Sequence, residues 1–147
     1  MSSNLLPDER TKRFVAILNK KIETGRLMNA LGHMTAGLAG GSGKAEEMCF
    51  LQYHDKDGGT HPNTSLFPFI VLQADNSNQI RTVRGECLAR GIPFTDFTHT
   101  MTEGTSAEQV ERTRQTPEAD LDYWGICMFG STEDIRAFTK KFSLFKQ

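Results

Sequence analysis

The sequence lacks the features of membrane proteins and of disulfide-stabilised proteins. It has no run of about 18 apolar residues, so no membrane-spanning helix is expected. Its first residues, MSSNLLPDERTKR, lack the apolar segment of a signal peptide. Its three cysteines, Cys49, Cys87 and Cys127, are odd in number and far apart, which argues against a disulfide framework and a zinc ribbon. We therefore expect a cytoplasmic protein with no membrane partner.

Several motifs that identify enzymes are also missing. The sequence has no Gly-x-Ser-x-Gly elbow, Walker A loop or dinucleotide-binding fingerprint. Gly40-Gly41-Ser42-Gly43 follows an expected helix instead of preceding one, so it indicates a helix end. The net charge of −1 provides no overall basic field for nucleic acid, although a local basic patch stays compatible with it. No cofactor is expected.

The composition indicates one globular domain. The chain has 147 residues, 37% of them hydrophobic and 24% charged, which suits a single domain with its own core. Residues 1–11 are polar and contain Pro7, so we expect a loose N-terminal arm there. The domain is predicted to span residues 12–147.

The stretch Lys12–Gly43 predicts a strand, a short turn and a helix. Phe14–Leu18, FVAIL, is a continuous apolar run typical of a strand buried on both faces. Thr24 is a candidate helix cap. The apolar residues Leu27, Leu31, Met34 and Leu38 then recur at helical spacing. In open α/β sheets ligands bind beyond the carboxyl ends of strands, so the turn 19–26 is the first place to look for a site.

The rest of the chain continues an alternation of strands and helices. Strands are expected over residues 47–53, 66–74, 92–101 and 121–130, and helices over 75–91, 106–115 and from Ser131 or Thr132 onward. Asp57-Gly58 predicts a hairpin and therefore at least one antiparallel pair. The pattern predicts an α/β fold of three α/β/α layers with a mixed four- to five-stranded sheet.

The segment Gly25–His33, GRLMNALGH, resembles the first helix of peptidyl-tRNA hydrolase II. Gly91-Ile92-Pro93 with residues 97–102 resembles a later strand of that family, and Trp124–Gly130 resembles the strand before its last helix. The chain is also similar to a family of uncharacterised bacterial domains that share this fold. That likeness rests on Asp57-Gly58 with His61, on FPFIVLQA and on GICMFG, and it covers nearly all of residues 12–145.

The resemblance implies the three-layer fold and a homodimer, but this sequence departs from the hydrolase at its functional positions. Arg26 stands where the hydrolase has a lysine, and Ala30 where it has a glutamine. Residues 99–103, HTMTE, lack the aspartate of its Asp-Ala-Gly-x-Thr motif. Lys21 of the basic turn is kept. We therefore expect a protein that binds without the ancestral catalysis.

The ligand-binding candidates surround the expected strand-to-helix turn. They are Lys20, Lys21, Arg26, Asn29, His33, His99 and Thr102. The three cations can hold a phosphate or carboxylate beside a helix N-terminus, or they can form a solvated basic turn. The expected ligand is a small anion or the phosphate of a tRNA terminus. The alternative is a hydrolase of peptidyl-tRNA or a related ester, with a rebuilt active site in which His33 or His99 moves the proton and Arg26 stabilises the oxyanion.

Two other groups receive a simpler interpretation. His54, Asp55, Asp57 and His61 resemble a metal site, but hairpin chemistry explains them and no metal is expected. Cys87 can be a nucleophile if a histidine lies near it, yet its place on an apolar helix face indicates a core thiol. Cys49 and Cys127 lie in apolar runs and indicate core positions as well.

Overall fold

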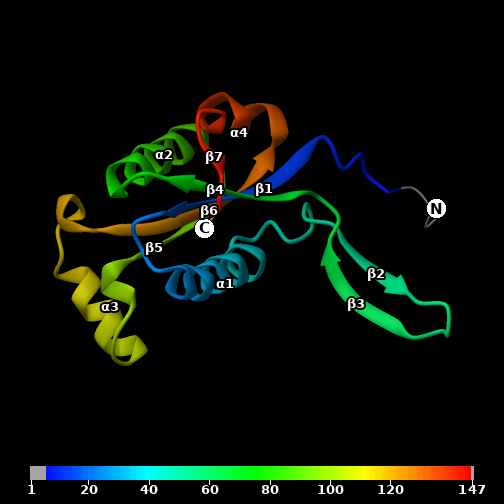
Figure 1. The fold of residues 1–147 in the computed structure, drawn as a ribbon, viewed down its shortest axis with the longest axis horizontal. Coiled ribbons are helices and arrows are strands. Elements are labelled where there is room, and N and C mark those ends of the chain that lie inside the picture. Colours follow the sequence, from blue (N-terminus) through cyan, green and yellow to red (C-terminus); the bar gives the residue numbers. More distant parts are fainter. Residues whose placement is uncertain (1–5, 147) are drawn as a thin grey trace.

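The computed structural model describes residues 6–146 as one α/β domain (Figure 1). Its elements, in chain order, are β1 (Lys12–Asn19), α1 (Thr24–Gly41), β2 (Phe50–His54), β3 (Thr60–Ser65), β4 (Phe69–Ala74), α2 (Ser77–Arg90), β5 (Phe94–Thr98), the 3₁₀ turn η1 (His99–Met101), α3 (Ser106–Arg114), the 3₁₀ turn η2 (Glu118–Asp120), β6 (Tyr123–Ser131), α4 (Thr132–Thr139) and β7 (Ser143–Leu144). Of the helices in this range, none combines the length and the apolar character that crossing a membrane requires.

The main sheet is mixed and has five strands in the order β5-β6-β1-β4-β7. The central strand β1 runs parallel to β4 and antiparallel to β6, and β6 is also antiparallel to β5. Strands β1, β4 and β5 therefore point the same way. The predicted mixed sheet is confirmed, with five strands. The two-residue β7, which pairs with β4, was not predicted.

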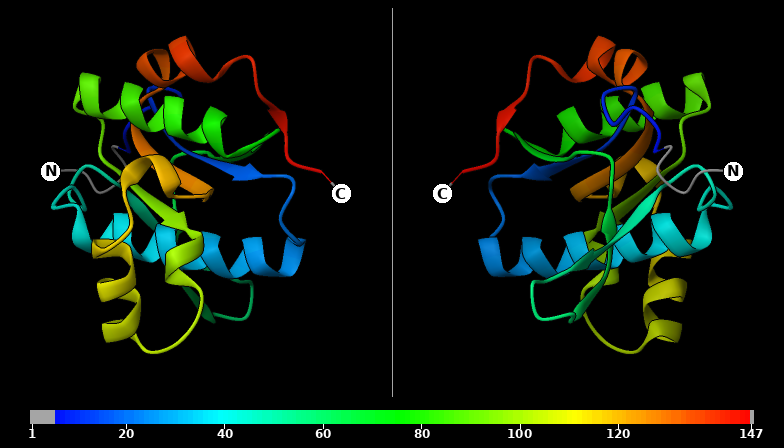
Figure 2. Two further views of the ribbon diagram at one scale, coloured as in Figure 1. Left: turned by 90° about the vertical axis from the view of Figure 1, so that its left-hand side faces the viewer. Right: turned by 90° about the vertical axis from the view of Figure 1, so that its right-hand side faces the viewer.

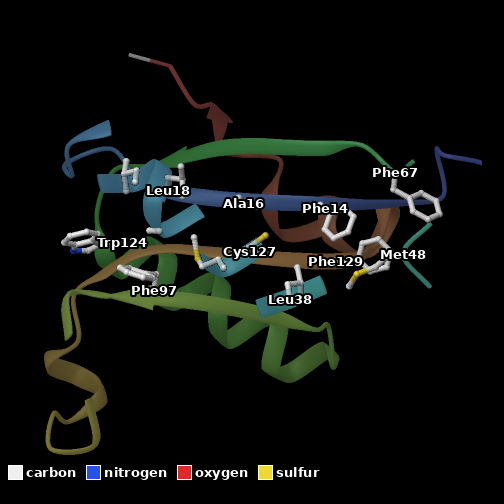
Figure 3. Packing of buried hydrophobic residues seen from close by; sticks show 13 residues of the cluster. Phe14, Ala16, Leu18, Leu38, Met48, Phe67, Phe97, Trp124, Cys127 and Phe129 are labelled. Carbon is white, nitrogen blue, oxygen red and sulfur yellow. The ribbon is translucent and has the colours of Figure 1, made fainter. Parts of the chain in front are cut away.

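The helices cover the two faces of the sheet, as Figure 2 shows, with α1 on one face and α2 and α4 on the other. Even-numbered β1 residues such as Phe14, Ala16 and Leu18 pack toward α1, and the alternate residues Val15 and Ile17 pack toward α2 and α4. Residues Phe14–Leu18 are all buried, so the predicted two-sided strand is confirmed. Figure 3 shows the α1-side core from close by.

Helix α1 docks on the sheet through Leu27, Ala30, Met34 and Leu38, while Leu31 is only partly buried. Burying one such leucine or methionine side chain stabilises the fold by about 1.5–3 kcal/mol. The predicted cap is wrong, because Glu23 occupies the N-cap position and Thr24 is the first helical residue. The Thr24 hydroxyl is buried and has no hydrogen-bond partner in the structure.

The hairpin predicted at Asp57-Gly58 exists, but it stands apart from the main sheet. Its strands β2 and β3 pair only with each other, and in Figure 1 they project away from the body. The prediction over residues 47–53 placed the first strand too early, and it missed β3 altogether. The sequence of β3, THPNTS, is polar because neither of its faces is buried.

The remaining differences are local. The run Asp75-Asn76-Ser77 predicts a cap for α2, and Asn76 provides it, while Gly91 ends the helix in the left-handed conformation, at φ 67°. The spacing of Ile80, Val83, Cys87 and Leu88 predicts one apolar face, but Leu88 is exposed. The strand predicted over residues 92–101 is shorter, because the chain turns into η1 at His99. Ser131, one of the two starts predicted for the last helix, caps α4, and Ile135 is buried on the inner face of that helix.

Candidate functional site

One edge of the main sheet collects the carboxyl ends of three strands. Strands β1, β4 and β5 are mutually parallel, so Asn19, Ala74 and Thr98 end at the same edge. Helix α1 and the turn η1 both begin there. Beyond this edge a parallel α/β sheet offers room for a ligand, and the turn after β1 lies where the sequence predicts a site.

Asn19 fixes the turn that leads into α1. Its side chain is buried, its Nδ2 donates to the carbonyl of Tyr123 at 3.1 Å, and its Oδ1 accepts from the N–H of Lys21 at 3.0 Å. The N–H of Lys20 donates to the carbonyl of Ala74 at 3.0 Å. The start of α1 is therefore tied to β4 and β6, and its position relative to the sheet is set by buried hydrogen bonds.

A first hollow of about 260 Å³ lies beside the first turn of α1. Its lining comprises Glu23, Gly25, Arg26, Asn29, Phe97, Thr102 and Trp124. The Arg26 guanidinium lies 5.4 Å from the ring centroid of Trp124, and the Phe97 and Trp124 rings lie 5.7 Å apart. In Figure 3 these two aromatic side chains lie next to each other at one end of the core. They form an apolar floor with a cation above it.

A second hollow of about 460 Å³ adjoins the first along α1. The two share Asn29, Phe97 and Thr102, and we call them together the α1 cleft. The second hollow adds His33, whose ring lies 6.1 Å from that of Phe97, and it is closed by residues from Met101 to Gln109. The Thr95 hydroxyl donates to the carbonyl of Met34 at 2.8 Å, which holds α1 against β5.

The electrostatics of the α1 cleft favour an anion at its Arg26 end. Helix α1 has no side-chain cap and no acidic residue in its first turn, whereas α2, α3 and α4 are each capped by a side chain. Within residues 6–146, Arg26 forms no ion pair. Glu23 is the one acidic residue that lines the first hollow. Free N–H groups and an unpaired guanidinium therefore converge there.

The structure brings together four of the seven predicted ligand-binding residues. Arg26, Asn29, His33 and Thr102 line the α1 cleft. Lys20 instead pairs with Asp75, with 2.8 Å between Nζ and Oδ1, and the exposed Lys21 lines neither hollow. The basic turn is thus divided, with only Arg26 directed to the cleft.

His99 lies outside both hollows and fastens the start of β6. Its backbone N–H donates to the carbonyl of Asp122 at 3.0 Å, and its Nδ1 accepts from the Asp122 N–H, also at 3.0 Å. A ring nitrogen that accepts this bond carries no proton, so a neutral His99 in this arrangement has its proton on Nε2. That tautomer ties the loop to the start of β6 through Nδ1, which leaves only the Nε2–H for a further hydrogen bond.

Trp124 and Phe97 are the site residues that the sequence did not indicate. Each is an apolar residue in an apolar strand, and both appear as ordinary core positions. Their shared place depends on β6 being antiparallel, which brings its first residues beside the last residues of β5. A tryptophan at a strand end next to a predicted cleft is the signal that was available.

The side chain of Asp55 forms hydrogen bonds within the hairpin. Asp55 accepts from the N–H groups of Asp57 and Gly59 at 2.9 Å each and lies 2.8 Å from His61 Nε2. The hydrogen bond from His61, more than the backbone bonds, lowers the pKa of Asp55. No set of three or more His, Cys, Asp or Glu side chains in the described chain is arranged to hold a metal ion.

The thiols of Cys87 and Cys127 belong to the core, as predicted. Both residues are buried, and burial raises the pKa of each to about 12. Sγ of Cys87 faces the thioether of Met128 at 3.9 Å. Cys49 is partly buried at the edge of the α1-side core. Neither buried thiol has the lowered pKa of a nucleophile.

Comparison with known proteins gives a family and a fold. Residues 12–146 match the family model "Protein of unknown function (DUF2000)". A solved structure of a protein of unknown function from Agrobacterium tumefaciens strain C58 superposes with a TM-score of 0.78 at 17% identity, covering 92% of this chain and 98% of that one. No curated protein matches. Neither match links the chain to peptidyl-tRNA hydrolase II, and the structural one shows the fold alone.

Proposed function

We propose, for a chain that belongs to the DUF2000 family of proteins of unknown function, that the α1 cleft binds a small anionic ligand. The observation that carries this proposal is the unpaired Arg26 beside the uncapped first turn of α1. A carboxylate or phosphate there accepts hydrogen bonds from both the guanidinium and the helix N–H groups.

The rest of the cleft selects a ligand with a planar or apolar part. Phe97 and Trp124 are largely buried, and the parts of their rings that line the first hollow provide an apolar floor for a ring of the ligand. Asn29 and Thr102 offer an amide and a hydroxyl at the boundary between the two hollows. A phosphate joined to a planar ring, as at the end of an RNA chain, meets both requirements. A free aromatic carboxylate meets them as well.

The alternative, an ester hydrolase with a rebuilt site, has less support from the geometry. His99 lines neither hollow, and its Nδ1 already accepts the Asp122 N–H. His33 lines the second hollow and is the remaining candidate for proton transfer. Release of the N-blocked aminoacyl group from a labelled peptidyl-tRNA analogue tests this alternative. Turnover that disappears in an Arg26→Ala, His33→Ala double variant would establish catalysis in place of simple binding.

The relation to peptidyl-tRNA hydrolase II and the homodimer remain proposals that rest on the resemblance of Gly25–His33. Light scattering coupled to gel filtration measures the mass of the particle and tests the dimer. A mass of 16.4 kDa would contradict it.

The binding proposal can be tested by the fluorescence of Trp124, the only tryptophan of the chain. The purified protein is titrated with inorganic phosphate, adenosine 5′-monophosphate and N-acetylphenylalanine, with sodium chloride at matched ionic strength as the blank. We expect a saturable change for at least one probe, and tighter binding of the nucleotide than of phosphate because its base can stack.

Two variants distinguish direct contact between Arg26 and the ligand from the general effect of positive charge in the turn. Arg26→Gln removes the cation over Trp124 and is expected to weaken binding by about tenfold or more. Lys21→Gln removes the same charge from the same turn but from a residue outside both hollows, so its effect stays within about twofold. Equal losses in the two variants, or no saturable change with any probe, would refute the proposal.

A further inference from the structure

A third hollow, with an excess of positive charge, lies at the opposite end of the sheet from the α1 cleft. It has a volume of about 620 Å³ and is lined by Arg10, Thr11, Ser131, Thr132, Glu133, Arg136, Ala137 and Lys140. We call it the α4 hollow. Strand β6, which leads into it, is antiparallel to β1, which leads to the α1 cleft. The two sites therefore lie at opposite edges of the sheet.

The lining of the α4 hollow is basic although the whole chain is not. Three cations, from Arg10, Arg136 and Lys140, face one carboxylate, from Glu133. Arg10 is paired with Asp8, at 3.0 Å between Nε and Oδ1. Neither Arg136 nor Lys140 has a carboxylate within ion-pair distance among residues 6–146. The chain as a whole carries a net charge of −1, so this concentration is local.

A further cation, Arg13, lies close enough to Arg136 for the two charges to repel each other, and it forms no ion pair among residues 6–146. Arg13 pairs with Gly130 in the sheet and shares the face of Val15, which α4 covers. Its Nε is buried and donates no hydrogen bond. Burial lowers the pKa of Arg13, and the positive charge of Arg136 lowers it further. The buried hydroxyl of Thr132, in the wall of the hollow, also has no partner.

Cations that outnumber the carboxylates around them repel one another in the protein alone and are stabilised by a bound anion. Arginine guanidinium groups bind phosphate oxygens in a bidentate geometry, and lysine adds a point charge. The volume of about 620 Å³ lies in the range of about 300–1,000 Å³ typical of small-molecule sites, so it exceeds what a bare phosphate fills.

We propose that the α4 hollow binds a phosphate dianion, free or as the monoester of a small molecule. Arg136 and Lys140 contact the phosphate from one helix face, and Arg10 contacts it from the segment before β1. Arg13 acts from below through its charge, without contact. This site is independent of the α1 cleft, since the two share no residue.

The test uses two-dimensional ¹⁵N–¹H spectra of the full chain, titrated with inorganic phosphate or with glycerol 3-phosphate at constant ionic strength. We expect saturable shifts of the amides of residues 131–137 and of the Arg136 side chain. A higher affinity for glycerol 3-phosphate would identify a phosphate monoester as the ligand class. A higher affinity for inorganic phosphate would identify the free ion. Shifts that sodium chloride reproduces, or no shifts at millimolar concentration, overturn the proposal.

Two variants of α4 and its end provide the matched comparison. Arg136→Gln is expected to weaken phosphate binding by about tenfold or more. Lys141→Gln removes one charge from a residue adjacent to Lys140 that does not line the hollow, and it leaves the affinity within about twofold. Equal affinities in both variants refute the site.

The thermal midpoint separates binding from structure. Arg136→Gln removes a charge that repels Arg13, so the variant unfolds at the wild-type temperature or above it. A fall in its midpoint would instead indicate a structural role for Arg136. The Arg26→Gln variant of the α1 cleft keeps the shifts of residues 131–137, so the two proposals can fail separately.

Discussion

Replacing Gly125 by alanine tests the close packing between β6, β1 and α1. A Cβ built on Gly125 lies 2.8 Å from the Met34 Cε and 2.9 Å from the Leu18 Cδ2, and 3.3 Å from the carbonyl oxygen of Ile17. The two side-chain atoms can shift, but the carbonyl belongs to the neighbouring strand, in which Leu18 pairs with Gly125. Overpacking of this kind destabilises a protein by about 1–3 kcal/mol.

A control on the same strand isolates the clash from the general effect of alanine. At Gly130 the nearest atoms to a new Cβ are Ile135 Cδ1 at 3.6 Å and Ile92 Cγ2 at 3.7 Å, which are ordinary contacts. Gly130→Ala should therefore gain about 0.4–1 kcal/mol from the restricted unfolded chain. Both alanines restrict that chain, so the difference between the variants measures the steric cost alone.

The assay is thermal unfolding followed by circular dichroism. A free-energy loss of 1 kcal/mol lowers the midpoint of a chain of this size by about 2–4 °C. We expect Gly125→Ala to unfold below the wild type and Gly130→Ala at or above it. Displacement of α1 would also expose the neighbouring Trp124 and move its emission to longer wavelength. Equal midpoints for the two variants would refute the close packing of α1 on β6.

Two further predictions concern buried titratable groups. Burial raises the pKa of Asp96 despite its 2.9 Å ion pair with Arg84. Between the ordinary carboxyl pKa and this raised pKa, the unfolded chain loses the proton of Asp96 before the folded protein does. The free energy of unfolding of the wild type, relative to that of Asp96→Asn, should therefore fall as the pH rises through this range. Urea unfolding of both proteins at pH 3 and 7 measures this, and a rise with pH would contradict it. With pKa values of about 12, Cys87 and Cys127 should not react with an aromatic disulfide reagent at pH 8. One equivalent is then released from the native protein, by Cys49, and three in urea; three from the native protein would contradict their burial.

The central strand and first helix could be predicted because burial leaves a strong mark on their sequence. Phe14–Leu18 has no polar residue since both of its faces are covered, and the spacing of Leu27, Met34 and Leu38 repeats the helix period. The hairpin turn was predictable from Asp57-Gly58, since Gly58 adopts φ 88°, which glycine tolerates. Strand β3 left no such mark, because a strand exposed on both faces needs no apolar alternation.

The sequence predicts the part of the candidate site that comes from neighbouring residues, but not the part that the folding of the sheet brings together. The turn after β1 and the face shared by Arg26, Asn29 and His33 follow from local spacing. The aromatic floor does not, because Phe97 and Trp124 meet only through the order β5-β6-β1 of the sheet. Lys20 and Lys21 show the same limit, since a basic turn in the sequence does not tell which of its side chains lines the cleft.

Because the β2–β3 hairpin is separate from the main sheet, its tip is a suitable place to attach a label or insert a peptide. Its strands satisfy each other's hydrogen bonds, and none of their side chains is buried. The hairpin follows the last turn of α1 (Figure 1). The α1 cleft begins at the first turn of that helix and extends along it as far as Met34. A dye, an affinity tag or an inserted peptide at its tip would thus leave the core and the cleft unaltered.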